Sequence, residues 1–284
     1  MKIRLAYVPY RSITVKTMSP IRNLALLSFT ILFLACILTS CLSLPRNKGV
    51  LFQTSTINAL LEGIYDGEMT FRQLKKFGDF GLGTFSALDG EMIGLNGQFY
   101  RIGADGNVHL VADDVTTPFA VVTFFRPDQF IKVENIPALA KLEEYLNTLL
   151  PSPNIFFAIR IEGRFQSVKT RSVPAQKKPY PPLLEVAKQQ SLFEFHNVDG
   201  TIIGFRCPNY AKEINVSGYH LHFITAEKNG GGHLLDCFIK EAKISIAKLH
   251  KLHLVLPDSP EFYRVDLSKN KQEEVKQVEK QSDK

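Results

Sequence analysis

Residues 218–223, Gly-Tyr-His-Leu-His-Phe, and the nearby residues 230–233, Gly-Gly-Gly-His, restrict the local fold more than any other part of the sequence. Alternate side chains of a strand lie on one face, so His220 and His222 can reach the same ion. The glycines allow the chain to turn back and bring His233 beside them. Three neutral imidazoles leave coordination positions open for water or substrate, as in catalytic zinc sites. The pattern therefore predicts a strand, a turn and a metal site.

The His-X-His pair alone has a second interpretation, as the polar face of a strand, because histidine is common at protein surfaces. The three glycines directly before His233 favour the metal site, since they mark a position where backbone geometry dictates the sequence. The remaining histidines have no such setting and are interpreted as ordinary polar positions: His109, His196, His250 and His253.

The basic character of the chain is confined to its start. Residues 1–61 contain seven of the 34 Lys and Arg residues and none of the 28 Asp and Glu residues. The remaining 27 basic and 28 acidic residues leave the rest of the chain with a net charge of about −1, which offers no electrostatic surface for nucleic acid. We therefore expect no nucleic-acid partner.

Residues 1–40 have the order of an export signal: a basic region, an apolar run from Leu24 to Leu38, and small residues before Cys41. The apolar run is short for a transmembrane span. The junction Leu-Thr-Ser-Cys at 38–41 resembles the bacterial lipoprotein box. That resemblance implies cleavage before Cys41, a lipid on its sulfur as the sole membrane contact, and an exported protein on the periplasmic or extracellular face. An uncleaved N-terminal anchor is the alternative, and Met18 is an alternative initiator to Met1.

Only Cys207 and Cys237 remain once Cys36 leaves with the signal and Cys41 carries lipid. One disulfide between them is permitted in an oxidising compartment, but the pair forms no disulfide framework and lacks a Cys-X-X-Cys motif. We expect two buried thiols.

The body of the chain is expected to begin after a polar linker at residues 41–53. Short helices are expected after Ser55 and Thr70. The glycines of residues 78–85 are too dense for a regular strand interior and indicate close backbone approach. One amphipathic helix is expected over residues 137–149. Strands are expected at residues 98–102, 108–111, 120–125, 155–161, 165–170, 201–205, 217–224, 234–246 and 252–256.

Two turns are expected between these strands, at Asp105-Gly106 and at Glu162-Gly163. The charged tail from Lys269 to Lys284 is typical of a solvated helix or a disordered end. The fold class predicted is α+β, in which an N-terminal part with a mixed β-sheet (residues 54–170) packs on a smaller, β-rich, metal-binding part (residues 171–284).

Motifs throughout the chain after the linker resemble those of the α-acetolactate decarboxylases. They lie at residues 78–85, 88–91, 118–119, 159–161, 168–171, 200–205, 218–224 and 231–233. The resemblance implies decarboxylation of 2-acetolactate to (R)-acetoin and CO2, in acetoin and butanediol biosynthesis, by a zinc-dependent homodimer without an organic cofactor.

The resemblance also implies the site residues. It assigns zinc to His220, His222 and His233, and it adds Glu91, Arg171 and a C-terminal glutamate. Spacing from His233 gives that glutamate as Glu279, with Glu273 and Glu274 as alternatives. Thr84 is either a substrate-binding residue or a structural residue of a glycine-rich turn.

The chemistry of these residues suits a decarboxylation. The planar guanidinium of Arg171 matches a carboxylate or a developing oxyanion. Glu91 and Glu279 are the candidate proton donors, because a carboxyl in a partly dry pocket has a raised pKa. Glu91 also has a structural interpretation, as a turn residue after Asp89-Gly90.

Two other functions use a His-X-His strand. Cupin-like metal oxygenases place a glutamate ligand close after the pair and a last histidine in a later motif, a plan that the Gly-Gly-His sequence does not follow. A zinc-capturing lipoprotein without catalysis accounts for the three histidines and the lipid, but not for Glu91 together with Arg171.

Overall fold

The computed structural model describes residues 48–279. These residues belong to one compact unit. The expected export signal, Cys36 and the lipidated Cys41 lie outside the described residues. Within residues 48–279 no helix is both long and apolar enough to cross a membrane.

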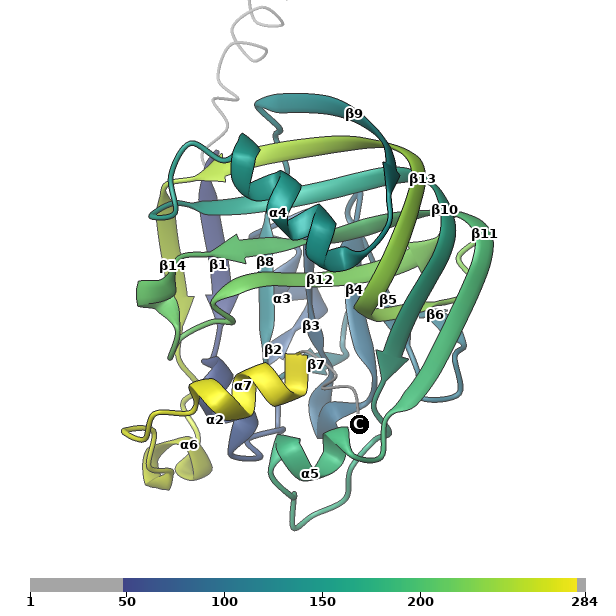
Figure 1. Cartoon of the computed structure of the whole chain (residues 1–284). Coiled ribbons are helices and arrows are strands. Elements are labelled where there is room, and N and C mark those ends of the chain that lie inside the picture. The colour runs from purple at the N-terminus through teal and green to yellow at the C-terminus, as the bar shows by residue number, and fades with distance from the viewer. Residues whose placement is uncertain (1–47, 280–284) are drawn as a thin grey trace, which may run out of the picture. The chain divides into compact units, whose positions relative to one another are not determined.

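Two large sheets dominate the structure (Figure 1). The seven-stranded sheet has the order β14 (Lys251–Val255), β1 (Val50–Thr54), β8 (Ala120–Thr123), β3 (Phe80–Thr84), β4 (Glu91–Leu95), β5 (Gln98–Ile102) and β6 (Val108–Leu110). The five-stranded sheet has the order β10 (Phe156–Ser172), β11 (Ser191–Cys207), β12 (Gly218–Thr225), β13 (Gly231–Leu249) and β9 (Gln129–Ile136). A small third sheet pairs β2 (Met69–Thr70) with β7 (Thr116–Thr117).

Short helices connect and cover these strands. They are α2 (Ile57–Leu61), α3 (Phe71–Leu74), α4 (Leu139–Leu149), α5 (Leu183–Ala187), α6 (Pro260–Arg264) and α7 (Gln272–Glu279), with 3-10 turns η1 (Ser86–Leu88) and η2 (Asn209–Ala211). The predicted amphipathic helix is confirmed as α4, and Thr70 caps α3 with a capping box. The cap of α2 is Thr56 and not Ser55, because the Thr56 hydroxyl accepts the Ala59 N–H.

The seven-stranded sheet is mixed, as predicted. β1 runs parallel to β14, whereas its other neighbour, β8, is antiparallel. The expected linker up to Gln53 is therefore wrong in its last residues. Leu51 and Phe52 are fully buried, so β1 belongs to the centre of the fold.

The five-stranded sheet closes on itself. β10 pairs with both β11 and β13, while β12 pairs with β11 and β13, and β9 extends the sheet beyond β13. The expected turn at Glu162-Gly163 is wrong, because both residues lie inside the continuous strand β10. A Cβ atom at Gly163 would collide with the carbonyl oxygen of Glu241 on β13. This glycine permits close backbone contact rather than a turn.

The chain is α+β and mostly β, but the two sheets do not follow the expected boundary at residue 170. That boundary falls inside β10. Strand β14, from the end of the chain, joins the first sheet, and β9, from the first half, joins the second sheet. The sheets share one apolar core, in which Phe80 of β3 and Phe205 of β11 pack edge to face.

The charged tail contains a docked helix, which corrects the expectation of a solvated or disordered end for residues 272–279. Val275 and Val278 are buried in the core shared by the two sheets. They are three positions apart in the sequence, so both lie on one face of α7. The prediction for the cysteines is confirmed, since Cys207 and Cys237 are buried free thiols.

Candidate metal centre

Strand register brings the central side chains of the site together. His222 of β12 lies opposite His233 of β13, and His233 lies opposite Arg171 of β10. Side chains at paired positions share a face of the sheet. His220 lies two residues before His222 and therefore occupies the same face. The hairpin pattern of the sequence thus produces the predicted cluster.

The three imidazoles can hold one metal ion. One ring nitrogen from each histidine lies within 4.8 Å of the others, and all three residues are buried. The Nε2 atoms of His220 and His222 are 3.3 Å apart, and the ring centroids in the three pairs are separated by 5.1, 5.1 and 5.3 Å. Nitrogen atoms converging at this spacing fit a transition metal such as zinc.

A backbone carbonyl from the other sheet orients one ligand. The Nδ1–H of His222 donates to the carbonyl oxygen of Met92 on β4, at 2.9 Å. That hydrogen bond leaves the lone pair of Nε2 free for a metal, which is the usual support for a histidine ligand. Nothing in the sequence marks Met92 for this role, because a backbone carbonyl carries no side-chain signature.

The histidines are held in the neutral form that ligates metals. Burial lowers the pKa of His222 to about 3, partly offset by its bond to Met92. Burial also lowers the pKa of His220 and His233 well below the ordinary value, with nearby positive charge adding to the effect. A neutral imidazole needs to lose no extra proton to offer a lone pair.

Two carboxyl groups approach the histidines from outside the five-stranded sheet. Glu91 begins β4, and its Oε2 lies 3.6 Å from Nε2 of His222. Glu279 ends α7, and its Oε2 lies 3.6 Å from Nε2 of His233 and 3.7 Å from Nε2 of His220. This Oε2 atom is buried and has no hydrogen-bond partner among the described residues. A cation at the histidine nitrogens would satisfy it.

Burial favours the protonated form of both carboxyls. It raises the pKa of Glu91 to about 7, against the opposing charge of Arg171. It raises the pKa of Glu279 to about 8, where Arg171 lowers the value and Glu91 raises it further. A bound cation would lower both values.

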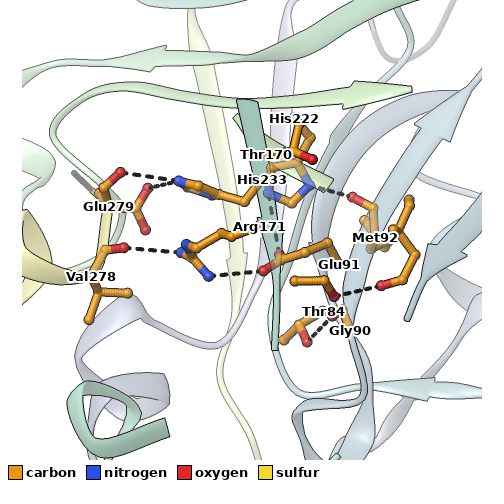
Figure 2. A network of polar contacts seen from close by, with 12 residues as sticks. Thr84, Gly90, Glu91, Met92, Thr170, Arg171, His222, His233, Val278 and Glu279 are labelled. Carbon is orange, nitrogen blue, oxygen red and sulfur yellow. Dashed lines mark hydrogen bonds and ion pairs between the residues drawn. The ribbon is translucent and has the colours of Figure 1, made fainter. Parts of the chain in front are cut away.

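Arg171 links the two carboxyl-bearing elements. Its Nη1 donates to Oε1 of Glu91 at 3.0 Å, and its Nη2 donates to the carbonyl oxygen of Val278 at 3.1 Å (Figure 2). The guanidinium is 5% exposed. Its Nε has no hydrogen-bond partner among the described residues, so the N–H of this atom remains for another acceptor.

Thr84 lies in the wall of the site. Its hydroxyl donates to the carbonyl oxygen of Gly90 at 2.8 Å, directly before Glu91. Gly90 has a φ of 87°, which favours glycine in the turn that leads into β4. Thr84 also lines a cavity of about 40 Å³ together with Glu91 and Arg171. The geometry is therefore compatible with both roles expected for Thr84.

The structure separates the three tail glutamates. Glu273 and Glu274 pair with Lys276 and Lys271, respectively, and only Glu279 contacts the histidines within the described part of α7. The other histidines remain outside this cluster. His253, for example, packs edge-on against Phe52 and Phe77 in another part of the fold.

Comparison with known proteins identifies the family of this arrangement. The sequence pattern of the family Alpha-acetolactate decarboxylase matches residues 51–269. A curated protein of that name from Methanosarcina mazei is 47% identical over 231 residues, which span 81% of this chain and 80% of the relative. The Bacillus subtilis protein of that name is 44% identical over 217 residues, which span 76% of this chain and 85% of the relative.

Solved structures agree with the sequence match. The crystal structure of alpha-acetolactate decarboxylase from Bacillus subtilis strain 168 has a TM-score of 0.79 and 42% identity, over 81% of this chain and 98% of that one. A Staphylococcus aureus protein described as similar to alpha-acetolactate decarboxylase has a TM-score of 0.77 and 26% identity, over 81% of this chain and 99% of that one. The family pattern ends before α7, so the position of Glu279 rests on the geometry described above.

Proposed function

The chain belongs to the alpha-acetolactate decarboxylase family of carboxy-lyases, and we propose that it converts 2-acetolactate to (R)-acetoin and CO2 with zinc held by His220, His222 and His233. This reaction would serve acetoin and butanediol biosynthesis. The observation that carries the zinc dependence is the convergence of three buried, neutral imidazoles beside two carboxyls and one guanidinium.

The donor set fits zinc in number and chemistry. Three neutral nitrogens would hold the ion, and carboxyl oxygens of Glu91 and Glu279 lie 3.6 to 3.7 Å from those nitrogens. When bound, the ion would supply a Lewis acid that stabilises the negative charge left as CO2 departs. The protein's contribution is to fix the ligands, exclude bulk water and place charged groups around the substrate.

Arg171 would orient the substrate. Two of its nitrogens are already held by Glu91 and by the carbonyl oxygen of Val278, which fixes the plane of the guanidinium. Its remaining Nε–H can donate to the substrate carboxylate or to the oxygen where negative charge develops. A single such bond suits a decarboxylase, because a tight grip on the carboxylate would stabilise the ground state and slow the loss of CO2.

A buried carboxyl would deliver the proton to the carbon that loses CO2. The ion pair with Arg171 favours the charged form of Glu91, whereas Oε2 of Glu279 has no hydrogen-bond partner among the described residues. The contacts therefore favour Glu279 as the acid and Glu91 as the group that positions Arg171. A single donor on one side of the substrate would give a single hand of acetoin.

The two rival functions are not favoured. Both accommodate a His-X-His strand, but neither accounts for membership of a decarboxylase family. Neither requires a guanidinium and two carboxyls of raised pKa beside the histidines.

The decisive test is the reaction itself. We expect the purified protein with zinc to release CO2 and form acetoin from 2-acetolactate without oxygen. A chelator should stop both, and added zinc should restore them. Gas and acetoin should be measured together. Oxygen consumption in place of CO2 release would indicate the oxygenase, and zinc binding without product would indicate the capture protein.

We also propose that the protein is a homodimer and is exported as a lipoprotein. The order of basic, apolar and small residues before Cys41 supports the second part. In a bacterial host, Cys41→Ala should abolish lipid labelling. The protein should then either keep its uncleaved N-terminal segment or be released from the membrane fraction. Unchanged labelling of this variant would contradict the lipid attachment.

A further inference from the structure

Strands β12 and β13 separate beside the metal centre. They are paired only from Ile224 opposite Gly231 to His222 opposite His233. Beyond this point, residues 218–221 of β12 pair with β11, while β13 continues along β10. The opening between the two strands therefore begins at the metal ligands, with His220 on one side and His233 on the other.

Helix α4 spans this opening and is tied to both strands. At its start, the Leu139 N–H donates to Oδ1 of Asp236 on β13, at 2.8 Å. Towards its end, the hydroxyl of Tyr219 on β12 donates to Oδ1 of Asn147, at 2.8 Å. Leu142 of α4 is fully buried against the five-stranded sheet. The helix thus covers the opening and is fixed at both ends, but it does not fill the space between the two strands.

A crevice of about 330 Å³ runs beneath the first turn of α4. Exposed Ala140 lies at its outer end, Tyr219 and Leu235 line its sides, and His233 and Glu279 lie at its inner end. The cavity on the other side of the site, between Thr84, Arg171 and Glu279, measures about 40 Å³. By the same measure the crevice beneath α4 is about eight times larger, so it offers the more spacious approach to the histidines.

The far side of the site is closed by α7, which is firmly docked. Val275 and Val278 are 7% and 4% exposed, and Nη2 of Arg171 holds the carbonyl oxygen of Val278. Before the helix, Nζ of Lys271 lies 2.5 Å from Oε1 of Glu62. Undocking α7 would expose this apolar face and remove Glu279 from the histidines. Entry through the crevice requires neither.

We infer that small molecules reach the metal centre between β12 and β13 beneath α4, and that α7 stays docked during turnover. The substrate identity assumed here rests on the proposed function. Ala140 and Leu235 then determine how bulky a substrate can pass, because they line the passage and are neither metal-ligand candidates nor carboxyl groups of the site.

The substitution Ala140→Trp tests the passage. Ala140 is exposed, so the indole can cover the outer end of the crevice without disturbing the core. We expect kcat/KM for acetolactate to fall by about tenfold or more, with zinc content unchanged. The matched control is Lys141→Trp, at the next residue of α4, which is exposed and outside the crevice. That variant should stay within about twofold of the unsubstituted protein.

The chain contains no tryptophan, so each variant carries a single indole that reports its own surroundings. Emission from Ala140→Trp should be blue-shifted relative to Lys141→Trp, which verifies that the indole fills the crevice. A second readout does not depend on catalysis. Pyridine-2,6-dicarboxylate, a chelator of similar size to the substrate, should remove zinc about tenfold more slowly from Ala140→Trp than from Lys141→Trp.

The outcomes separate the two proposals. Equal rates of zinc removal from the two variants, with a blue-shifted indole in Ala140→Trp, would overturn the passage and indicate opening at α7. Slower zinc removal without CO2 release from any protein would support the passage and overturn the proposed function. Slower removal together with reduced kcat/KM supports both.

Discussion

Substituting His233 by alanine should remove the metal and abolish decarboxylation together. His233 is central to the site, since it lies opposite both His222 and Arg171 in the register of the sheet and contacts Glu279. Zinc affinity should fall by more than about 100-fold, the upper range for residues that merely support a ligand. Turnover should fall in parallel with metal content, because the two remaining histidines are too few ligands to hold the ion in a fixed geometry.

The control must separate loss of a ligand from loss of the fold. His233 is 2% exposed, so its truncation also leaves a small cavity. His250→Ala removes an exposed imidazole close in sequence to the same strand and should keep both zinc and activity. Zinc content, thermal midpoint and CO2 release should be measured for both variants. A folded His233→Ala protein that decarboxylates acetolactate at the normal rate without zinc would refute the metal proposal.

The cluster of three histidines could be predicted because it depends on short-range sequence spacing, and the structure contains it. Two-residue spacing places His220 and His222 on one face, and a glycine-rich turn makes β13 antiparallel to β12. The pairing of His222 with His233 follows from these two features. Arg171 and Glu91 reach the same place through long-range register and sheet packing. Sequence spacing does not encode those, and their positions were expected only from the family resemblance.

Glycine was the least reliable signal for secondary structure. Glu162-Gly163 has the composition of a turn, but Gly163 lies in the middle of β10, where the backbones of three strands approach closely. The glycines of residues 78–85 were correctly expected to permit close backbone approach, since a Cβ atom at Gly81 would collide with the carbonyl oxygen of Val121. Gly81 and Gly83 nevertheless belong to strand β3, whereas Gly78 lies before it. Absence of a side chain can serve either a turn or a close contact, and composition alone does not distinguish them.

The high charge of the tail predicts a solvated or disordered end, and it gives no sign of the apolar face by which α7 docks. Only two apolar residues of α7 are buried, Val275 and Val278, and their spacing of three was the available signal. Tertiary contacts complete the docking, because Lys271 pairs with Glu62 and Arg171 donates a hydrogen bond to the carbonyl oxygen of Val278. A charged segment can thus be ordered by few apolar contacts when it also forms hydrogen bonds and ion pairs with polar groups of the folded core.

Replacing each carboxyl of the site by its amide should separate the acid from the residue that positions Arg171. Glu279→Gln keeps the shape of the side chain but removes the proton that the reaction needs. Turnover should fall by about 10² to 10⁴-fold, the usual contribution of a general acid, while the fold is retained. Zinc content should stay near normal, because the three histidine nitrogens are unchanged.

Glu91→Gln should behave differently because of its ion pair. Arg171 is 5% exposed and Glu91 is 8% exposed, so the amide leaves a buried guanidinium without its counter-charge. The free energy of unfolding should fall by about 3 kcal/mol, the lower range for removing one partner of a buried pair. Turnover should also fall, through displacement of Arg171. Urea unfolding of the two variants therefore distinguishes them before any kinetics are measured.

The pH profile and the product configuration complete the assignment. Burial raises the pKa of Glu279 to about 8, so a donor at this position is protonated at neutral pH and loses its proton as the pH rises. Turnover of the unsubstituted protein should accordingly fall on the alkaline side, at a pH that a bound cation moves downward. This limb should vanish in Glu279→Gln and persist in Glu91→Gln. Arg171 lies between the two carboxyls, which therefore lie on different sides of its guanidinium (Figure 2). Loss of enantiomeric excess in Glu91→Gln, with Glu279→Gln unaffected in rate and product, would instead make Glu91 the proton donor.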